Sequence, residues 1–307
     1  DSIAFVGTLE RDMIVGHVSE AGQMIPTRLT RIVPLRAPAN RLEAWQQDLE
    51  VASARLSEYD RSFDSRAREE LKQALAHLEL SLPRLNDAEI LVALSRAVAL
   101  AGNAHTRLRL DPTHQGSFST EFPLRMWWFS DGPYVVRAAH AYQRALGCRV
   151  VAIDGHDLTT VTNEMGTLFA GNPSWSAYLR PIYLVSPDVL YGLGLIPSME
   201  VASFTFEDAR GNQFDLWVRP EPINVSARAS EAWQELSPLL ATGNPPWMTA
   251  LATKPDLLPL YLRHPEDPYW FEFLPENGIL YFQFNGSEDA EKGPSFQEFG
   301  DSLLAFV

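Results

Sequence analysis

Cysteine and lysine are scarce in this sequence of 307 residues, and a long hydrophobic run is missing. Cys148 is the single cysteine, which excludes an intrachain disulfide, a CxxC redox pair and a cysteine-rich zinc site. We expect its thiol to be a small buried apolar group rather than a nucleophile. No apolar segment approaches the ~20 residues that a membrane helix needs, so we expect no membrane span.

Familiar catalytic and ligand-binding motifs are also missing. The sequence contains no GxSxG elbow, no SxxK pair, no glycine-rich phosphate loop and no HExxH or HxH pair. We therefore expect neither a cofactor nor a metal. The turn His264–Asp267 could contact a cation, but a solvated turn is the favoured interpretation. Ser287 lies at a predicted strand end, where a turn serine is favoured over a nucleophile.

The composition is that of a globular protein, with 46% hydrophobic and 21% charged residues. Lysine and arginine number 25 against 39 acidic residues, which gives a net charge of −14. A chain this acidic is repelled by phosphate backbones and by anionic lipid surfaces. Binding to nucleic acid is thus disfavoured.

Hydrophobic periodicity and turn residues predict an α+β multidomain protein in four segments. Residues 1–35 alternate in three short antiparallel strands and resemble the end of a small β-domain. Residues 40–110 are helical, with three helices. Residues 115–222 are mostly strand and turn, and contain a strand, turn and helix over 147–169. Residues 223–307 are a linker followed by one hairpin and a last helix.

His105 stands at the most informative position. It follows Gly102, a residue typical of a helix end, and precedes the predicted strand Arg107–Leu110. A corner between two rigid elements can present a side chain to a cleft, and an imidazole that titrates near neutrality can act as a general base. The alternative is a histidine that binds the free carbonyls of the corner.

Several segments, taken in their order along the chain, resemble the tail-specific (carboxy-terminal processing) and tricorn-type serine peptidases. The corner Gly102–Thr106 reads Gly-Asn-Ala-His-Thr, where that family usually has Gly-Asp-Gly-His-Thr. The segment Gly147–Thr160 resembles a PDZ or degenerate PDZ module. The hairpin Tyr269–Phe284 resembles the first strands of the family's crotonase-like α/β catalytic core.

This resemblance implies a fragment of a bacterial serine endopeptidase that acts on peptide or protein substrates. His105 would be the general base, and the serine nucleophile would lie beyond residue 307, since nothing within 1–307 matches it. We expect the sequence to stop partway through a larger protein, and this chain alone to be inactive. The resemblance also implies a periplasmic or extracellular location. It does not indicate the oligomeric state.

Two departures from the family pattern keep other functions open. Asn103 replaces the usual aspartate, and Ala104 stands where tricorn has a serine. Other branches of the family use a Ser–Lys dyad, which would leave His105 without this role. The main alternative is a catalytically inactive peptide-binding or scaffold protein on the same fold. A weaker one is a sugar or lipid binder that uses Trp127, Trp128 and Trp270, since such aromatic residues are more often core.

Overall fold

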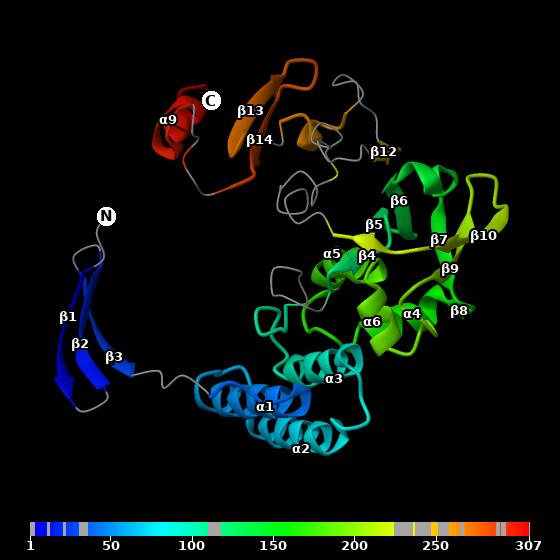
Figure 1. Ribbon diagram of the computed structural model, residues 1–307. Coiled ribbons are helices and arrows are strands. Elements are labelled where there is room, and N and C mark those ends of the chain that lie inside the picture. The colour runs from blue at the N-terminus through cyan, green and yellow to red at the C-terminus, as the bar shows by residue number, and fades with distance from the viewer. Residues whose placement is uncertain are drawn as a thin grey trace. The chain divides into compact units, whose positions relative to one another are not determined.

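The chain folds into two compact units, Asp1–Ala54 and Arg55–Val307. The computed structural model describes residues 4–10, 13–20, 23–30, 36–109, 118–223, 236, 247–250, 258–264, 267–286, 289 and 293–306. Helices and several antiparallel sheets alternate along it (Figure 1), so the expected α+β class is confirmed. The division into four segments remains a prediction.

The first unit contains the antiparallel sheet that the alternating pattern predicts. Its strands follow one another in chain order: β1 (Ala4–Glu10), β2 (Met13–Glu20) and β3 (Gln23–Thr30). Phe5 lies opposite Val18, and Ile14 lies opposite Leu29. Several apolar side chains of this sheet are exposed, Val6 at 73% among them.

Three helices follow, and their ends are set by local sequence signals. They are α1 (Arg41–Glu58), α2 (Ser65–Ser81) and α3 (Asp87–Ala99). The Asp64 carboxylate accepts a hydrogen bond from the Ala67 N–H and so caps α2. Of the two caps expected for α3, Asn86 is the one used, and it forms a reciprocal capping box with Glu89.

A seven-stranded sheet forms the centre of the second unit. Its order is β10-β9-β7-β6-β12, with β5 also paired to β6 and β8 to β7. The strands are β5 (Leu124–Phe129), β6 (Gly132–Ala138), β7 (Arg149–Ile153), β8 (His156–Asp157), β9 (Ala202–Glu207), β10 (Gln213–Val218) and β12 (Met248–Thr249). Strict alternation buries Ala202, Phe204 and Phe206 of β9. The pairs β5–β6 and β9–β10 are antiparallel hairpins, in line with the strand and turn expected for this segment.

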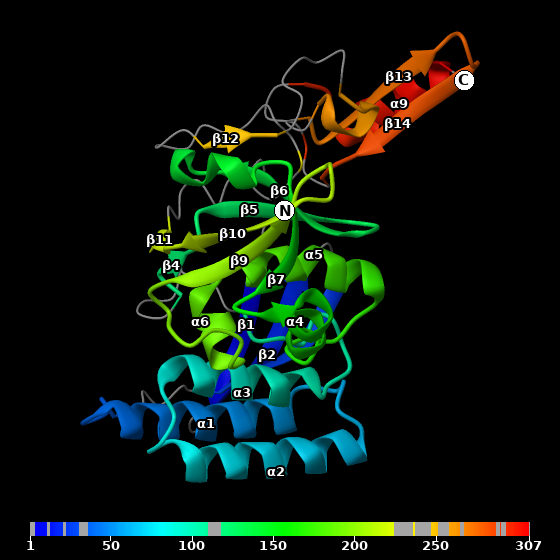
Figure 2. The same ribbon diagram turned by 90° about the vertical axis from the view of Figure 1, so that its right-hand side faces the viewer.

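Helices occupy more of residues 118–220 than the predicted strand and turn. The helix α4 (Leu158–Met165) begins after the Asp157 cap as expected but ends four residues before Phe169. Two further helices, α5 (Pro173–Leu184) and α6 (Pro187–Gly192), were not predicted, nor was the 3₁₀ helix η1 (His140–Ala145). The α5 helix packs beside β5, and α6 packs on α3, which in turn contacts α2 (Figure 2).

The central sheet of this unit and its helices enclose a large apolar cluster. Its members come from the sheet and from α4, α5 and α6, and the fully buried ones include Phe122, Met126, Val150, Met165, Leu184 and Phe204. Gly192 lets α6 approach α3 closely, because a Cβ there would lie 2.5 Å from the Ala88 carbonyl oxygen. No described helix is long and apolar enough to cross a membrane.

A second hairpin and the last helix are as predicted. The strands β13 (Tyr269–Leu274) and β14 (Ile279–Phe284) pair antiparallel, and α9 spans Phe296–Phe306. Phe299 of α9 packs on Tyr269, Phe271 and Phe282 of the hairpin. Two short pieces complete the unit: the β4 (Thr120–Glu121) and β11 (Glu221–Pro222) pair, and the 3₁₀ helix η4 (Leu260–Leu262).

Candidate active site at the His105 corner

The corner that carries His105 begins where α3 ends. Leu100 is the C-cap of α3, and Gly102 has a φ of +66°. This left-handed conformation turns the chain away from the helix axis, and glycine adopts it without strain. The predicted glycine helix stop is therefore confirmed.

Asn103 organises the residues that follow. Its side-chain oxygen accepts a hydrogen bond from the His105 N–H at 2.9 Å, and its backbone carbonyl accepts one from the Thr106 N–H at 3.2 Å. The first bond closes an Asx turn, a local motif that fixes the backbone of a short loop. The backbone of His105 is thus held by the residue two positions before it.

Two side-chain bonds tie the corner to the loop between α1 and α2. The Asn103 amide donates to the Ser62 hydroxyl at 2.8 Å, and the Thr106 hydroxyl donates to the Asp60 carboxylate at 2.7 Å. Asp60 also accepts a hydrogen bond from the Ser62 N–H at 2.7 Å. The residues on both sides of His105 are therefore fastened to one loop.

The charge state of Asp60 suits this arrangement. Partial burial raises the pKa of its carboxyl, but the hydrogen bonds from Ser62 and Thr106 and the nearby Arg68 outweigh this effect. The net pKa of Asp60 lies below its usual value, so the group is an ionised acceptor at neutral pH. A charged acceptor strengthens the bond from Thr106.

On another side the corner packs against the start of α5. A Cβ placed on Gly171 would lie 3.3 Å from the Ala104 Cβ and 2.6 Å from Cδ1 of Trp175. The Arg107 guanidinium stacks over the Trp175 ring at 5.0 Å from its centroid. Residues 107–109 form no strand, so the predicted strand after His105 is wrong over that part, and Leu110 lies outside the described residues. Arg107 packs on α5 instead of pairing in a sheet.

The His105 imidazole itself is exposed. Among the described residues it makes no hydrogen bond, ion pair or ring contact. The alternative in which the ring binds the free carbonyls of the corner is therefore wrong, because the Asn103 side chain and the main chain already order this turn. The corner presents a base whose backbone is fixed and whose ring faces away from the interior.

The other sequence candidates are structural where they are described. Cys148 is buried as expected, and burial, followed by the charge of Asp208, raises the pKa of its thiol. Trp127 packs on a small cluster with Val136 and Leu262, and Trp270 is only 8% exposed. Trp128 is half-buried against the central apolar cluster, and the Arg180 guanidinium lies 5.2 Å from its ring centroid. All three tryptophans thus pack against other parts of the chain, which disfavours a sugar or lipid binder that uses them as a platform.

Within the described residues, His264 adds no metal site. The His264 ring packs on Trp270, with its Nδ1 3.4 Å from an oxygen of Asp267. No group of metal-ligating side chains occurs within the residues described. Ser287 lies outside the described residues, so its interpretation as a turn serine stays a prediction.

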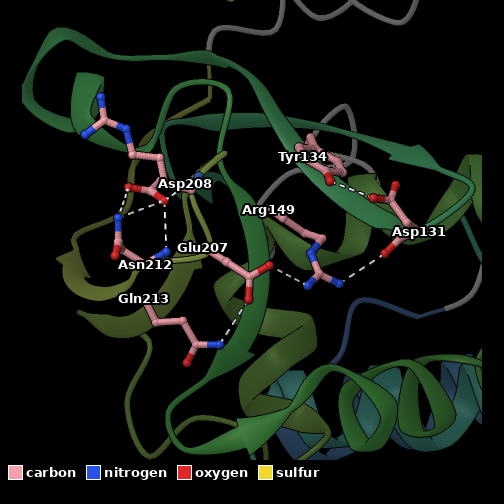
Figure 3. Close-up of polar contacts among 8 residues, drawn as sticks. Asp131, Tyr134, Arg149, Glu207, Asp208, Asn212 and Gln213 are labelled. Carbon is pink, nitrogen blue, oxygen red and sulfur yellow. Dashed lines mark hydrogen bonds and ion pairs between the residues drawn. The ribbon is translucent and has the colours of Figure 1, made fainter.

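A polar cluster that the sequence did not indicate lies where the strand ends of the central sheet meet (Figure 3). Arg149 of β7 donates to Glu207 of β9 at 2.7 Å and to the Asp131 carbonyl at 3.3 Å. Gln213 of β10 also donates to Glu207, and Tyr134 donates to the Asp131 carboxylate. The hydrogen bond from Arg149 is the main cause that lowers the pKa of Glu207. These groups bind one another and connect four strands, which is a structural role.

No protein family and no curated protein matches the sequence. Mature CPAF, the chlamydial protease-like activity factor, solved in complex with lactacystin, aligns with a TM-score of 0.52 and 13% identity. That alignment covers 86% of this chain and 54% of the CPAF chain. A serine-to-alanine variant of CPAF gives the same TM-score, identity and coverage.

CPAF is a serine protease of the tail-specific protease family. The present chain spans about half the length of the CPAF chains that it matches. At 13% identity the likeness concerns the fold alone. The resemblance stated from the sequence is thereby confirmed: over 86% of its length, this chain matches part of the fold of CPAF.

Proposed function

We propose that this chain is part of a serine endopeptidase of the tail-specific type, with His105 as the general base. The observation that carries the proposal is an exposed imidazole on a fastened corner, within a fold that matches CPAF. The serine nucleophile is assigned to a part of the enzyme outside residues 1–307, as the sequence resemblance implies. Peptides or proteins are the substrates.

In this mechanism His105 moves one proton twice. It takes the proton of the serine hydroxyl as Oγ attacks the carbonyl carbon of the scissile bond, and then gives it to the leaving amine. Within the described part of the chain no carboxylate contacts the His105 ring. The orienting carboxylate is therefore assigned elsewhere in the enzyme, and backbone N–H groups would stabilise the oxyanion.

Two other parts of the chain have proposed roles. The elements β7, β8 and α4 form a strand, a turn and a helix, which supports the assignment of a PDZ-like segment. In the proposed enzyme this segment binds an extended peptide by strand addition and holds its apolar C-terminal end. The hairpin β13–β14 with α9 supports the start of a crotonase-like α/β core. The proposed enzyme uses no cofactor and no metal, and acts in the periplasm or outside the cell.

A second function, an inactive peptide-binding or scaffold protein, is favoured by Ala104. This residue supplies no polar side chain beside His105, and its methyl group lies 3.3 Å from where a Cβ on Gly171 would stand. Fold does not determine activity, and the same framework serves either function.

Labelling with a serine-reactive fluorophosphonate separates these functions. The protein that carries this chain is treated with the probe as wild type, as His105→Gln and as His140→Gln. His140 is exposed and lies on η1, so its variant is the matched control. We expect labelling of the wild type and of H140Q, and a loss of at least tenfold in H105Q. No labelling of the folded wild type, or undiminished labelling of H105Q, refutes the proposal.

A further inference from the structure

We propose that Asp60 and Thr106 are positioning residues that fix the orientation of His105. Asp60 does so from the loop between α1 and α2, and Thr106 from the corner itself, neither of them touching substrate. This inference rests on the proposed function of His105 as the base. It adds Asp60, which neither the sequence motif nor the fold comparison indicates, and gives the motif residue Thr106 a role.

The loop that carries Asp60 is itself well anchored. The Arg68 guanidinium of α2 donates to the Ser57 carbonyl at 2.7 Å and to the Asp60 carbonyl at 2.8 Å. The Asp60 carboxylate also caps the turn by accepting from the Ser62 N–H. Asp60 therefore presents its second oxygen from a fixed backbone, as a support for a functional side chain requires.

Two side-chain hydrogen bonds, called ties here, join the corner to the loop between α1 and α2. The first tie is the Asn103–Ser62 bond, and the second is the Thr106–Asp60 bond at 2.7 Å. His105 lies between the two tied residues. With both ties made, the corner cannot rotate about either flank, so the direction of the His105 Cα–Cβ bond is set.

The two ties set the direction of the Cα–Cβ bond from which the His105 ring extends. The imidazole is exposed, and among the described residues no hydrogen bond or ion pair holds the ring itself. In a serine peptidase a base displaced by about 1 Å can lose roughly 10²-fold in rate. The placement of the ring then depends on the two ties, and the part-buried Thr106–Asp60 bond is the one that a single hydroxyl maintains.

The test uses a matched pair of substitutions at Thr106. Thr106→Val keeps the shape and branching of the side chain but removes the hydroxyl, whereas Thr106→Ser keeps the hydroxyl and removes a methyl group. The full 307-residue chain is labelled with ¹³C,¹⁵N-histidine, and the His105 signal is assigned from its absence in His105→Gln. NMR relaxation then gives the order parameter of the His105 backbone, and His140 serves as an internal reference.

We expect the His105 order parameter to fall in T106V from the rigid range near ~0.85 to below ~0.6, and to stay rigid in T106S. Asp60→Ala should act like T106V, because it removes the acceptor of the Thr106 hydroxyl. The His140 signal should not change in any variant. The inference is overturned if His105 stays rigid in T106V, or if T106S loosens it as much. These outcomes do not depend on catalysis, so a failed fluorophosphonate test would leave them distinct.

Discussion

Replacing Gly171 with alanine tests the packing that joins the His105 corner to α5. Gly171 has a φ of +141°, which L-residues rarely adopt, and such strain costs about 1–3 kcal/mol. The added Cβ would also lie 2.6 Å from Trp175 Cδ1 and 3.3 Å from the Ala104 Cβ. Overpacking of this kind costs about 1–3 kcal/mol more. We therefore expect Gly171→Ala to lower the free energy of unfolding by about 4 kcal/mol, the middle of the summed range.

Thermal unfolding followed by tryptophan fluorescence measures this loss. For a unit of this size, about 4 kcal/mol corresponds to a fall in Tm of about 8–16 °C. Gly211→Ala is the control, because Gly211 also has a positive φ, +81°, but a Cβ there meets no atom within 4 Å. It should cost only about 1–2 kcal/mol of backbone strain. If the two variants unfold within about 2 °C of each other, the close approach of Gly171, Trp175 and Ala104 is wrong.

Two further predictions concern ionisation. Because the pKa of Asp60 is lowered in the folded state, its contribution to stability is full above the unfolded pKa of about 3.9 and is lost as the pH falls through the lower folded pKa. Urea titrations between pH 6 and pH 3 should show that Asp60→Asn lowers the free energy of unfolding by roughly 1 kcal/mol at pH 6. The variant should also lose less of this free energy than the wild type as the pH falls, and an equal loss in both proteins contradicts the prediction. Burial raises the pKa of the Cys148 thiol, so Ellman's reagent should leave it unmodified in the native protein and titrate one thiol in urea, whereas rapid native reaction would show that the thiol is accessible.

Much of the fold follows from signals that lie close together in the sequence. Asp64 and Asn86 each cap a helix by accepting a hydrogen bond from the backbone N–H three residues further along the chain. A four-residue turn joins the strands of the hairpin β13–β14. Such features depend on neighbours along the chain, so periodicity and capping rules predict them. The location of His105 after a helix-ending glycine was predicted for the same reason.

The helices α5 and α6 were missed although their start signals are present. Asn172 precedes Pro173, and Ser186 precedes Pro187, which is a cap followed by proline at the first helical position. Pro181 inside α5 weakened the helical pattern, since proline removes a helix hydrogen bond. Tertiary packing overrides this preference, because Pro181 and Leu184 are buried against the central core.

The surroundings of His105 could not be predicted from the sequence, because its partners are distant. Thr106 bonds Asp60 across 46 positions, and Asn103 bonds Ser62 across 41. Nothing in the local sequence of either loop indicates its partner. The strand expected after His105 shows the same limit: an alternating segment predicts a strand, but here Arg107 stacks on Trp175 of α5 instead.

The structure also bears on Asn103, which stands where the family usually has an aspartate. The side-chain oxygen of Asn103 accepts a hydrogen bond from the His105 N–H, and its side-chain nitrogen donates one to the Ser62 hydroxyl. An asparagine makes these two contacts with one acceptor and one donor. An aspartate could make both with its two acceptor oxygens, because the Ser62 hydroxyl can donate as well as accept. The replacement therefore preserves both contacts and is no argument against an active base. Of the two departures, only Ala104 removes a polar group beside His105, so the choice between peptidase and scaffold depends on that position and on the serine that His105 would serve.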